Sequence, residues 1–216
     1  MTDIEISKII HKEFKEKSLL VTSQYLEIHS PIYESEQIRI ERIDRDKTNN
    51  KVIAYLPVKD EYFFFAVFID NKTGEILEID TESRNLVSVV FVSEILNSTQ
   101  LKSLTKLKCQ ECWNKGDKIP HKKAFYKHSG IVFYANPEPD GFEDKLEKLL
   151  NFLESDKEGI LLASTKAKGY IHVSMDFHRG NQLLGSFKME CEIVKRISTL
   201  NLEINFRITA WGNNFK

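Results

Sequence analysis

The fold is decided by residues 62–69, which read YFFFAVFI. Apolar side chains occupy both faces of this strand-forming run, so it predicts a strand in the middle of a sheet, covered on both sides. Residues 86–92 read LVSVVFV and repeat the pattern, which predicts a second strand of the same kind. The rest of the chain is therefore interpreted as the elements that surround these two strands.

The segment before residue 62 predicts one helix and an antiparallel meander. Thr2 and Glu5 form a capping box at the start of the helix, which should end near Lys17. Its apolar face is formed by Ile6, Ile9, Ile10 and Phe14. Strand-forming runs follow at residues 19–28, 37–43 and 51–58, and the hairpin loop DNKTG at residues 70–74 precedes a strand at 75–80.

The segment after residue 85 alternates strands with helices. We expect strands at residues 86–92, 131–134, 170–178 and 202–209, and helices at residues 98–107, 142–153, 158–166 and 189–200. The pattern predicts an α+β protein with a mostly antiparallel sheet and helices packed on one face. We divide it into two halves, residues 1–85 and 86–216, each with its own sheet segment.

Composition excludes several classes of protein. The 216 residues carry a formal net charge of −1, so no overall positive field attracts nucleic acid or an anionic membrane. Residues 1–85 carry 17 acids and 12 bases (−5), and the remainder carries 15 acids and 19 bases (+4). No signal peptide or membrane-length apolar run is found, and three cysteines suit a reducing compartment. We expect a cytoplasmic protein without a membrane partner.

An ordered set of motifs in the second half resembles a known family. The set comprises WNKGD (113–117), SGI (129–131), the helix FEDKLEKLLNFLES, the strand YIHVSMDFH, the helix IVKRISTLN and the strand LEINFRITA. It resembles the bacterial family called domain of unknown function 4279, over roughly residues 86–210. Cys109 departs from the pattern, which has a proline there. The resemblance implies a compact α+β domain without a known catalytic set, and by analogy a role such as toxin immunity.

Cys109 and Cys112 form a C-x-x-C motif. This spacing can place two thiolates on one metal or form a redox pair. A zinc ribbon needs a second pair, and Cys191 stands alone. The favoured interpretation is two unlinked cysteines at the end of a helix.

Four polar side chains share one face of the strand at residues 170–178, namely His172, Ser174, Asp176 and His178. Asp176 and His178 can share a metal, or Asp176 can orient His178 as a general base. The favoured alternative is the solvated face of an antiparallel sheet, because alternation explains these residues without any chemistry.

Trp113, Lys115 and Asp117 predict either a recognition loop or a structural anchor. A surface Trp beside a cation is typical of binding hot spots. Trp is mostly buried on average, however, which favours an anchor in which Gly116 turns the chain and Asp117 caps it. Trp211 lies past the last predicted strand and can contact a partner or fold back on the core.

Residues 115–128 form a loop that is rich in Lys and His and contains Phe125 and Tyr126. Such loops can bind single-stranded nucleic acid, although the net charge of −1 favours a simple solvated loop.

We therefore rank three hypotheses. The first is a non-enzymatic protein-binding module, including immunity-type toxin neutralisation. The second is a hydrolase that uses His172, Asp176 and His178, and the third is a ligand or nucleic-acid binder through this loop. No cofactor is expected.

Overall fold

The computed structural model describes residues 1–45, 50–179 and 187–212. The helices are α1 (Asp3–Glu16), α2 (Leu20–Leu26), α3 (Ser98–Lys102), α4 (Phe142–Glu154), α5 (Lys157–Lys166) and α6 (Cys191–Thr199). The strands are β1 (Tyr33–Glu34), β2 (Gln37–Ile38), β3 (Arg42–Asp44), β4 (Lys51–Pro57), β5 (Phe63–Asp70), β6 (Ile76–Ser93), β7 (Glu111–Trp113), β8 (Ser129–Phe133), β9 (Lys168–His178) and β10 (Glu203–Trp211). The α+β class is confirmed.

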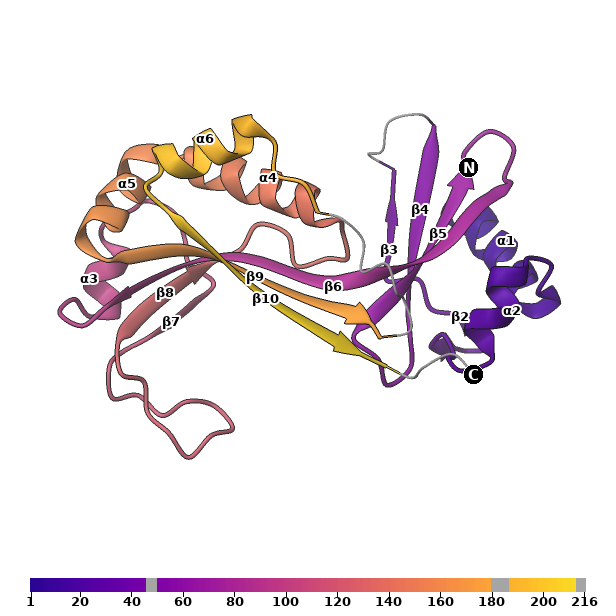
Figure 1. The fold of residues 1–216 in the computed structure, drawn as a ribbon, viewed down its shortest axis with the longest axis horizontal. Helices are drawn as coiled ribbons and strands as arrows, with labels where there is room; N and C mark the ends of the chain where they lie inside the picture. The colour runs from indigo at the N-terminus through magenta and orange to yellow at the C-terminus, as the bar shows by residue number, and fades with distance from the viewer. Residues whose placement is uncertain (46–49, 180–186, 213–216) are drawn as a thin grey trace.

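Eight strands form one sheet in which β6 is shared by both halves (Figure 1). The order is β10-β9-β6-β5-β4-β3, and β8 pairs with β6 and carries β7 at its outer edge. The pairs are antiparallel except β9 with β10, which are parallel and joined through α6. The two runs expected at residues 75–80 and 86–92 are one 18-residue strand. The boundary expected after residue 85 falls inside it.

The N-terminal half packs α1 and α2 on one face of β4 and β5. The capping box is present, since Thr2 Oγ1 accepts from the Glu5 amide and Glu5 Oε2 accepts from the Thr2 amide at 2.7 Å. The helix buries Ile6 and Ile10 in the same core cluster as Phe65 of β5.

The strand predicted at residues 19–28 is wrong, because residues 20–26 form α2. The buried carboxylate of Glu13 explains the difference. Its Oε1 accepts a 2.6 Å hydrogen bond from Thr22 Oγ1 and a 3.0 Å bond from the Leu19 amide. A carboxylate at a helix N-terminus satisfies free amides and favours the helix over the β preference of these residues.

The C-terminal half packs α4, α5 and α6 on one face of the sheet, as the alternation predicts (Figure 1). The core at this face is apolar and fully buried, and includes Phe91, Phe133, Leu146, Leu149 and Ile171. The short strand β7 is an element that the sequence did not predict.

Candidate functional site

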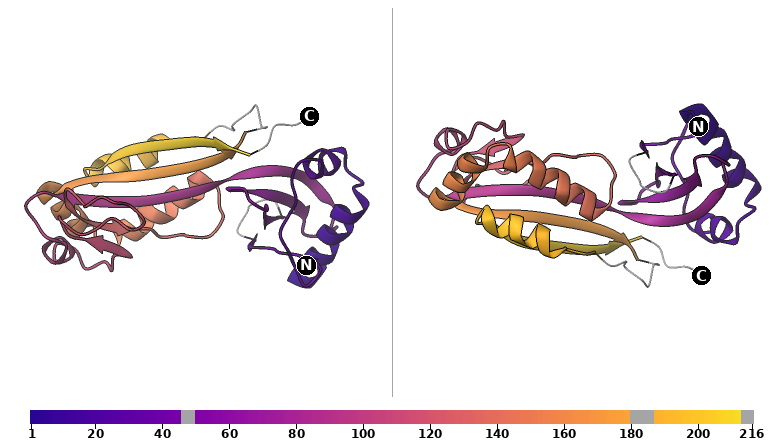
Figure 2. Two further views of the ribbon diagram at one scale, coloured as in Figure 1. Left: turned by 90° about the horizontal axis from the view of Figure 1, so that it is seen from below. Right: turned by 90° about the horizontal axis from the view of Figure 1, so that it is seen from above.

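No described helix covers the opposite face of the sheet in the C-terminal half. Along β6, Val87, Val89 and Phe91 are buried under the helices, and the alternate side chains face the other side. The two views of Figure 2 show this arrangement, with strands in front from below and helices in front from above. The uncovered face lies between the N-terminal half and a loop that projects from the β7–β8 hairpin (Figure 1).

A groove of about 930 Å³ follows this uncovered face. Leu86, Ser88 and Val90 of β6 and His172 of β9 line it, together with residues of the N-terminal half and of the β7–β8 hairpin. Its aromatic lining residues are Tyr62, Phe63, Phe64, Trp113, Tyr126 and Tyr134. Its charged lining residues are Arg39, Glu41, Glu61, Arg84, Glu111, Glu138 and Lys145. The groove therefore mixes aromatic surface with charges of both signs.

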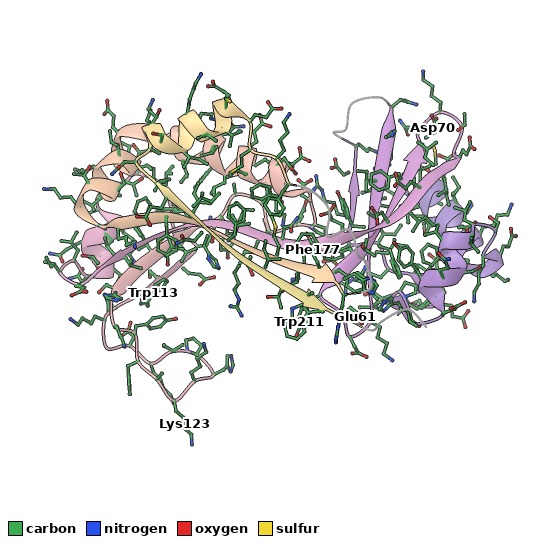
Figure 3. The ribbon with its side chains drawn as sticks, in the orientation of Figure 1. Glu61, Asp70, Trp113, Lys123, Phe177 and Trp211 are labelled. Carbon is green, nitrogen blue, oxygen red and sulfur yellow. The ribbon has the colours of Figure 1, made fainter. Side chains whose placement is uncertain are left out.

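The projecting loop, residues 114–128, forms a basic arm. It contains five Lys and one Asp, which gives it a formal charge of +4. Figure 3 shows Trp113 at its base and Lys123 at its tip, far from the sheet. Phe125 is 64% exposed. The arm therefore presents cations and one exposed aromatic ring beside the groove.

Trp113 fixes the base of the arm. Its indole Nε1 donates a 2.9 Å hydrogen bond to the carbonyl of His128, and its ring stacks on Tyr126 with centroids 4.9 Å apart. The indole occupies the space above Gly130, where an added Cβ would lie 2.3 Å from the ring. This glycine therefore allows the ring to lie flat on the hairpin. Trp113 is half-buried and also lines the groove.

The other residues of this motif shape a turn. Asp117 Oδ2 accepts a 2.7 Å hydrogen bond from the Asn114 amide, and Gly116 has a φ of 91°, which favours glycine. The Lys115 side chain is exposed, while its amide donates to Ser129 Oγ at 3.0 Å. Asp117 thus builds the turn, and Lys115 is presented to solvent.

Cys109 and Cys112 are free thiols. Cys109 packs against the C-terminal core, and burial, followed by the charge of Cys112, raises the pKa of its thiol. Cys112 is exposed in β7, with Lys102 Nζ 3.6 Å from its sulfur. Within the described ranges, no group of three or more His, Cys, Asp or Glu side chains is arranged to hold a metal ion.

The structure places His172, Asp176 and His178 in three different environments. His172 lines the groove, and burial, followed by the charge of Arg207, lowers its pKa. Asp176 Oδ1 accepts a 2.9 Å hydrogen bond from Trp211 Nε1. His178 is only 1% exposed, so its expected position on a solvated face is wrong. His172 and His178 are six residues apart, roughly 20 Å along the strand.

His178 is buried because the N-terminal half covers this end of β9. Its Nε2 lies 2.7 Å from Nε2 of His29, and His29 Nδ1 lies 3.4 Å from Glu61 Oε1. The rings of both histidines also contact Phe63. Burial, followed by the charge of His178, lowers the pKa of His29 to about 4. The His29 ring is therefore neutral at neutral pH, and the 2.7 Å separation fits a hydrogen bond in which one Nε2 donates to the other.

Trp211 closes this end of the sheet. Its indole is 45% exposed and its ring lies 5.5 Å from the ring of Tyr62, centroid to centroid. Figure 3 shows Trp211 next to Glu61, where the two halves meet. Arg84 lies 5.9 Å above the ring of Tyr62. Trp211 thus folds back on the chain through Asp176 and Tyr62 and keeps part of its ring exposed.

A second contact joins the halves on the other side of β6. Arg42 Nη1 lies 2.9 Å from Asp140 Oδ2, and the same guanidinium lies 3.5 Å from Asp44 and from Glu138. Lys148 Nζ also lies 2.8 Å from Asp140 Oδ2. Burial raises the pKa of the Asp140 carboxyl, but the hydrogen bonds from Lys148 and Arg42 outweigh it, so the net pKa is lowered.

Lys145 and Glu82 extend this network to the groove. Lys145 is 3% exposed and its amine donates to the carbonyl of Asn85, and burial lowers its pKa to about 8. Burial raises the pKa of Glu82 to about 7, although Asn85 Nδ2 donates to its Oε1 at 3.3 Å. Two ionisable groups with altered proton affinity therefore lie where the halves meet.

Two clusters join the halves, one around His29 and His178 and one around Arg42, Asp140 and Lys145; we call them the junction clusters. The sequence patterns predicted neither cluster, although the position of Lys145 in its helix indicated a buried partner. Residue 145 lies on the apolar face of the predicted helix, three residues after Phe142 and four before Leu149. A cation at such a position indicates a buried polar partner. His29 and Arg42 carry no comparable signal, because their partners are distant in the sequence.

Comparison with known families gives a match that covers the C-terminal half. The family model described as "Domain of unknown function (DUF4279)" matches residues 81–211, from the middle of β6 to the end of β10. No curated protein and no solved structure matches the chain. No helix in the described part of the chain is long and apolar enough to cross a membrane.

Proposed function

This chain belongs to the family described as a domain of unknown function (DUF4279), and we propose from its groove that it is a protein-binding module. The observation that carries the proposal is the groove of about 930 Å³ on the sheet face that no described helix covers, between the basic arm and the N-terminal half. A strand face with exposed aromatic and apolar side chains is typical of an interaction surface.

The extent of the groove favours a protein over a small molecule. Its lining residues come from both halves and from the β7–β8 hairpin, so a partner that fills the groove contacts three separate parts of the chain. Its composition agrees, because Tyr, Trp and Arg are enriched at interface hot spots. Leu86, 43% exposed on β6, lies among these lining residues.

The charges of the groove favour a protein over nucleic acid. The lining contains four acids and three bases, namely Glu41, Glu61, Glu111 and Glu138 against Arg39, Arg84 and Lys145. A phosphate backbone would meet no net positive charge there. The basic arm beside it suits an acidic patch on the partner, which would make the association faster and sensitive to salt.

The hydrolase alternative gains no support from the geometry. Asp176 accepts from Trp211 and His178 lies against His29 at 1% exposure, so the strand face does not present these side chains to a substrate. Toxin neutralisation is one form of the proposed binding. A captured partner that is an enzyme, and whose activity falls on binding, would identify that form.

The experiment places a photo-crosslinking amino acid at Leu86 in the groove and, as the control, at Leu161 on α5. The two leucines have nearly equal exposure, 43% and 42%, but lie on opposite sides of the sheet. In lysate of the native host, the variant at residue 86 should capture a protein that the variant at residue 161 does not. Equal capture at both positions, or none at residue 86, would contradict the proposal.

A further inference from the structure

The strand β10 forms a long, regular edge of the sheet. Among the described residues it pairs with β9 alone, and the pairing runs without a break through all nine residues from Glu203 to Trp211. The sheet's other edge strands, β3 and β7, are three residues long. An edge strand exposes a row of unpaired amide and carbonyl groups, which proteins usually shorten, interrupt with Pro or bulges, or guard with Lys. The strand β10, EINFRITAW, is nine residues long and has no Pro, Lys or bulge, and its charged side chains are Glu203 and Arg207.

Side-chain burial along β10 is incomplete as well. No residue of this strand is buried, whereas its neighbour β9 buries Ile171, Val173 and Met175 to 1% exposure or less. Ile208 is 47% exposed, and Val194 of the adjacent helix α6 is 50% exposed. In the part of the chain that the structure describes, the outer side of this edge therefore has no cover. Figure 2 shows β10 along the outer margin of the molecule in both views.

The charges of β10 complement those of a second copy in one register. In a two-fold antiparallel pair, some residue lies opposite its own copy. If that residue is Asn205, Glu203 lies opposite Arg207 of the second copy, and this happens twice. Opposite charges in directly facing positions stabilise an antiparallel pair. The same register places Ile204 opposite Phe206.

Neighbouring registers lose this match. Centring on Phe206 places Glu203 opposite Thr209, and centring on Arg207 places two guanidinium groups opposite each other. Both charged side chains are available for the favourable register. Arg207 is exposed and forms no ion pair with any described residue. Glu203 forms an ion pair with Lys168 at 3.6 Å, and both of these side chains are more than 60% exposed. Such surface pairs contribute little.

We infer that β10 pairs antiparallel with β10 of a second copy of this chain, centred on Asn205, to form a two-fold symmetric dimer with one continuous sheet. The symmetry axis is perpendicular to the sheet, so the uncovered faces of both copies lie on the same side. Two grooves on one side give the dimer two equivalent binding surfaces, which increases its avidity for a partner that presents two epitopes.

Cysteine cross-linking tests the register. In a background with Cys109, Cys112 and Cys191 changed to Ser, Asn205→Cys should form a disulfide-linked dimer under mild oxidation. Directly opposite residues have Cα atoms roughly 4.5–5.5 Å apart, within the reach of a disulfide. The control is Asn201→Cys, since residue 201 and its own copy would be roughly 27 Å apart in this register. Cross-linking of both variants alike, or of neither, would overturn the inference.

Charge exchange tests the ion pairs by sedimentation over a range of concentrations. Glu203→Arg and Arg207→Glu should each weaken dimerisation about tenfold or more, because like charges then lie opposite each other. The double variant Glu203→Arg/Arg207→Glu should restore it. A chain that is monomeric at every concentration, a dimer that neither single change weakens, or a double variant that stays monomeric would each overturn the inference.

Discussion

The two faces of the sheet in the C-terminal half differ in how completely the chain covers them. On the covered face, Val89 and Phe91 have no exposed surface. On the uncovered face of the same strand, Leu86 keeps 43% of its surface. Side chains of the first face stabilise the fold, whereas Leu86 on the second keeps surface that a partner can bury, although its neighbours Ser88 and Val90 are already buried. Stability and binding should therefore respond to different substitutions.

The largest expected effect is on the covered face. Phe91→Ala removes a fully buried ring that packs edge-to-face on Phe133, 6.2 Å between centroids, and should lower the free energy of unfolding by about 3–5 kcal/mol. Leu86→Ala on the uncovered face should cost less than about 1 kcal/mol. Urea denaturation of both variants measures the difference. Similar losses for the two would remove the distinction between the faces.

Asp140 tests whether the ion pairs between the two halves stabilise the fold, as the side chains of the covered face do. Asp140→Asn leaves the Arg42 guanidinium, 10% exposed, without its closest carboxylate and should cost about 3 kcal/mol. The control, Glu138→Gln, changes a carboxylate on the same guanidinium that is 66% exposed, and should cost less than about 1 kcal/mol. Equal effects in urea denaturation would show that the network does not join the halves.

Acidification tests the cluster in which His29 contacts His178. The folded pKa of His29 is about 4 and its ordinary value is 6.5, so the unfolded chain binds the extra proton in this range. Stability due to His29 is therefore complete above pH 6.5 and falls by up to about 3 kcal/mol as the pH falls to 4. Glu82, with its pKa raised to about 7, contributes the opposite slope between pH 7 and 4.5.

Because the two contributions oppose each other, the pH dependence of wild type must be compared with that of histidine variants. The pH dependence of the unfolding free energy should lose the His29 contribution in His29→Gln and keep it in His121→Gln, which changes an exposed imidazole. Identical slopes in wild type and His29→Gln would contradict burial of a neutral His29 beside His178.

Local sequence patterns predicted where helices and strands form better than they predicted what packs against each element. The capping box at Thr2 and the alternation around Val173 gave helix α1 and strand β9, because both depend on residues close in the sequence. His178 obeys the same alternation, yet it is buried, because His29 and Phe63 from the other half cover the end of β9. Alternation defines two faces of a strand but does not say what covers each face.

The same limit explains α2 and the candidate site. Residues 20–26 have β-forming side chains, but Glu13 from the preceding helix satisfies the first amide and a buried hydroxyl of a new helix. The groove was not predicted either, although Trp113 and His172 in its lining were candidate residues. Its shape arises from the long strand β6, which places the N-terminal half and the basic arm at opposite ends of one face (Figure 1).

We expect the smallest effect on stability from Leu86→Asp and its control, Leu161→Asp. The same two variants test the proposed function most directly. Both changes place a charge at an exposed leucine, so unfolding free energies should shift by less than about 1 kcal/mol. Titration calorimetry with the protein captured at residue 86 should show a Kd raised about tenfold or more by Leu86→Asp and nearly unchanged by Leu161→Asp. An unchanged Kd for Leu86→Asp would contradict the assignment of the uncovered face as the binding surface.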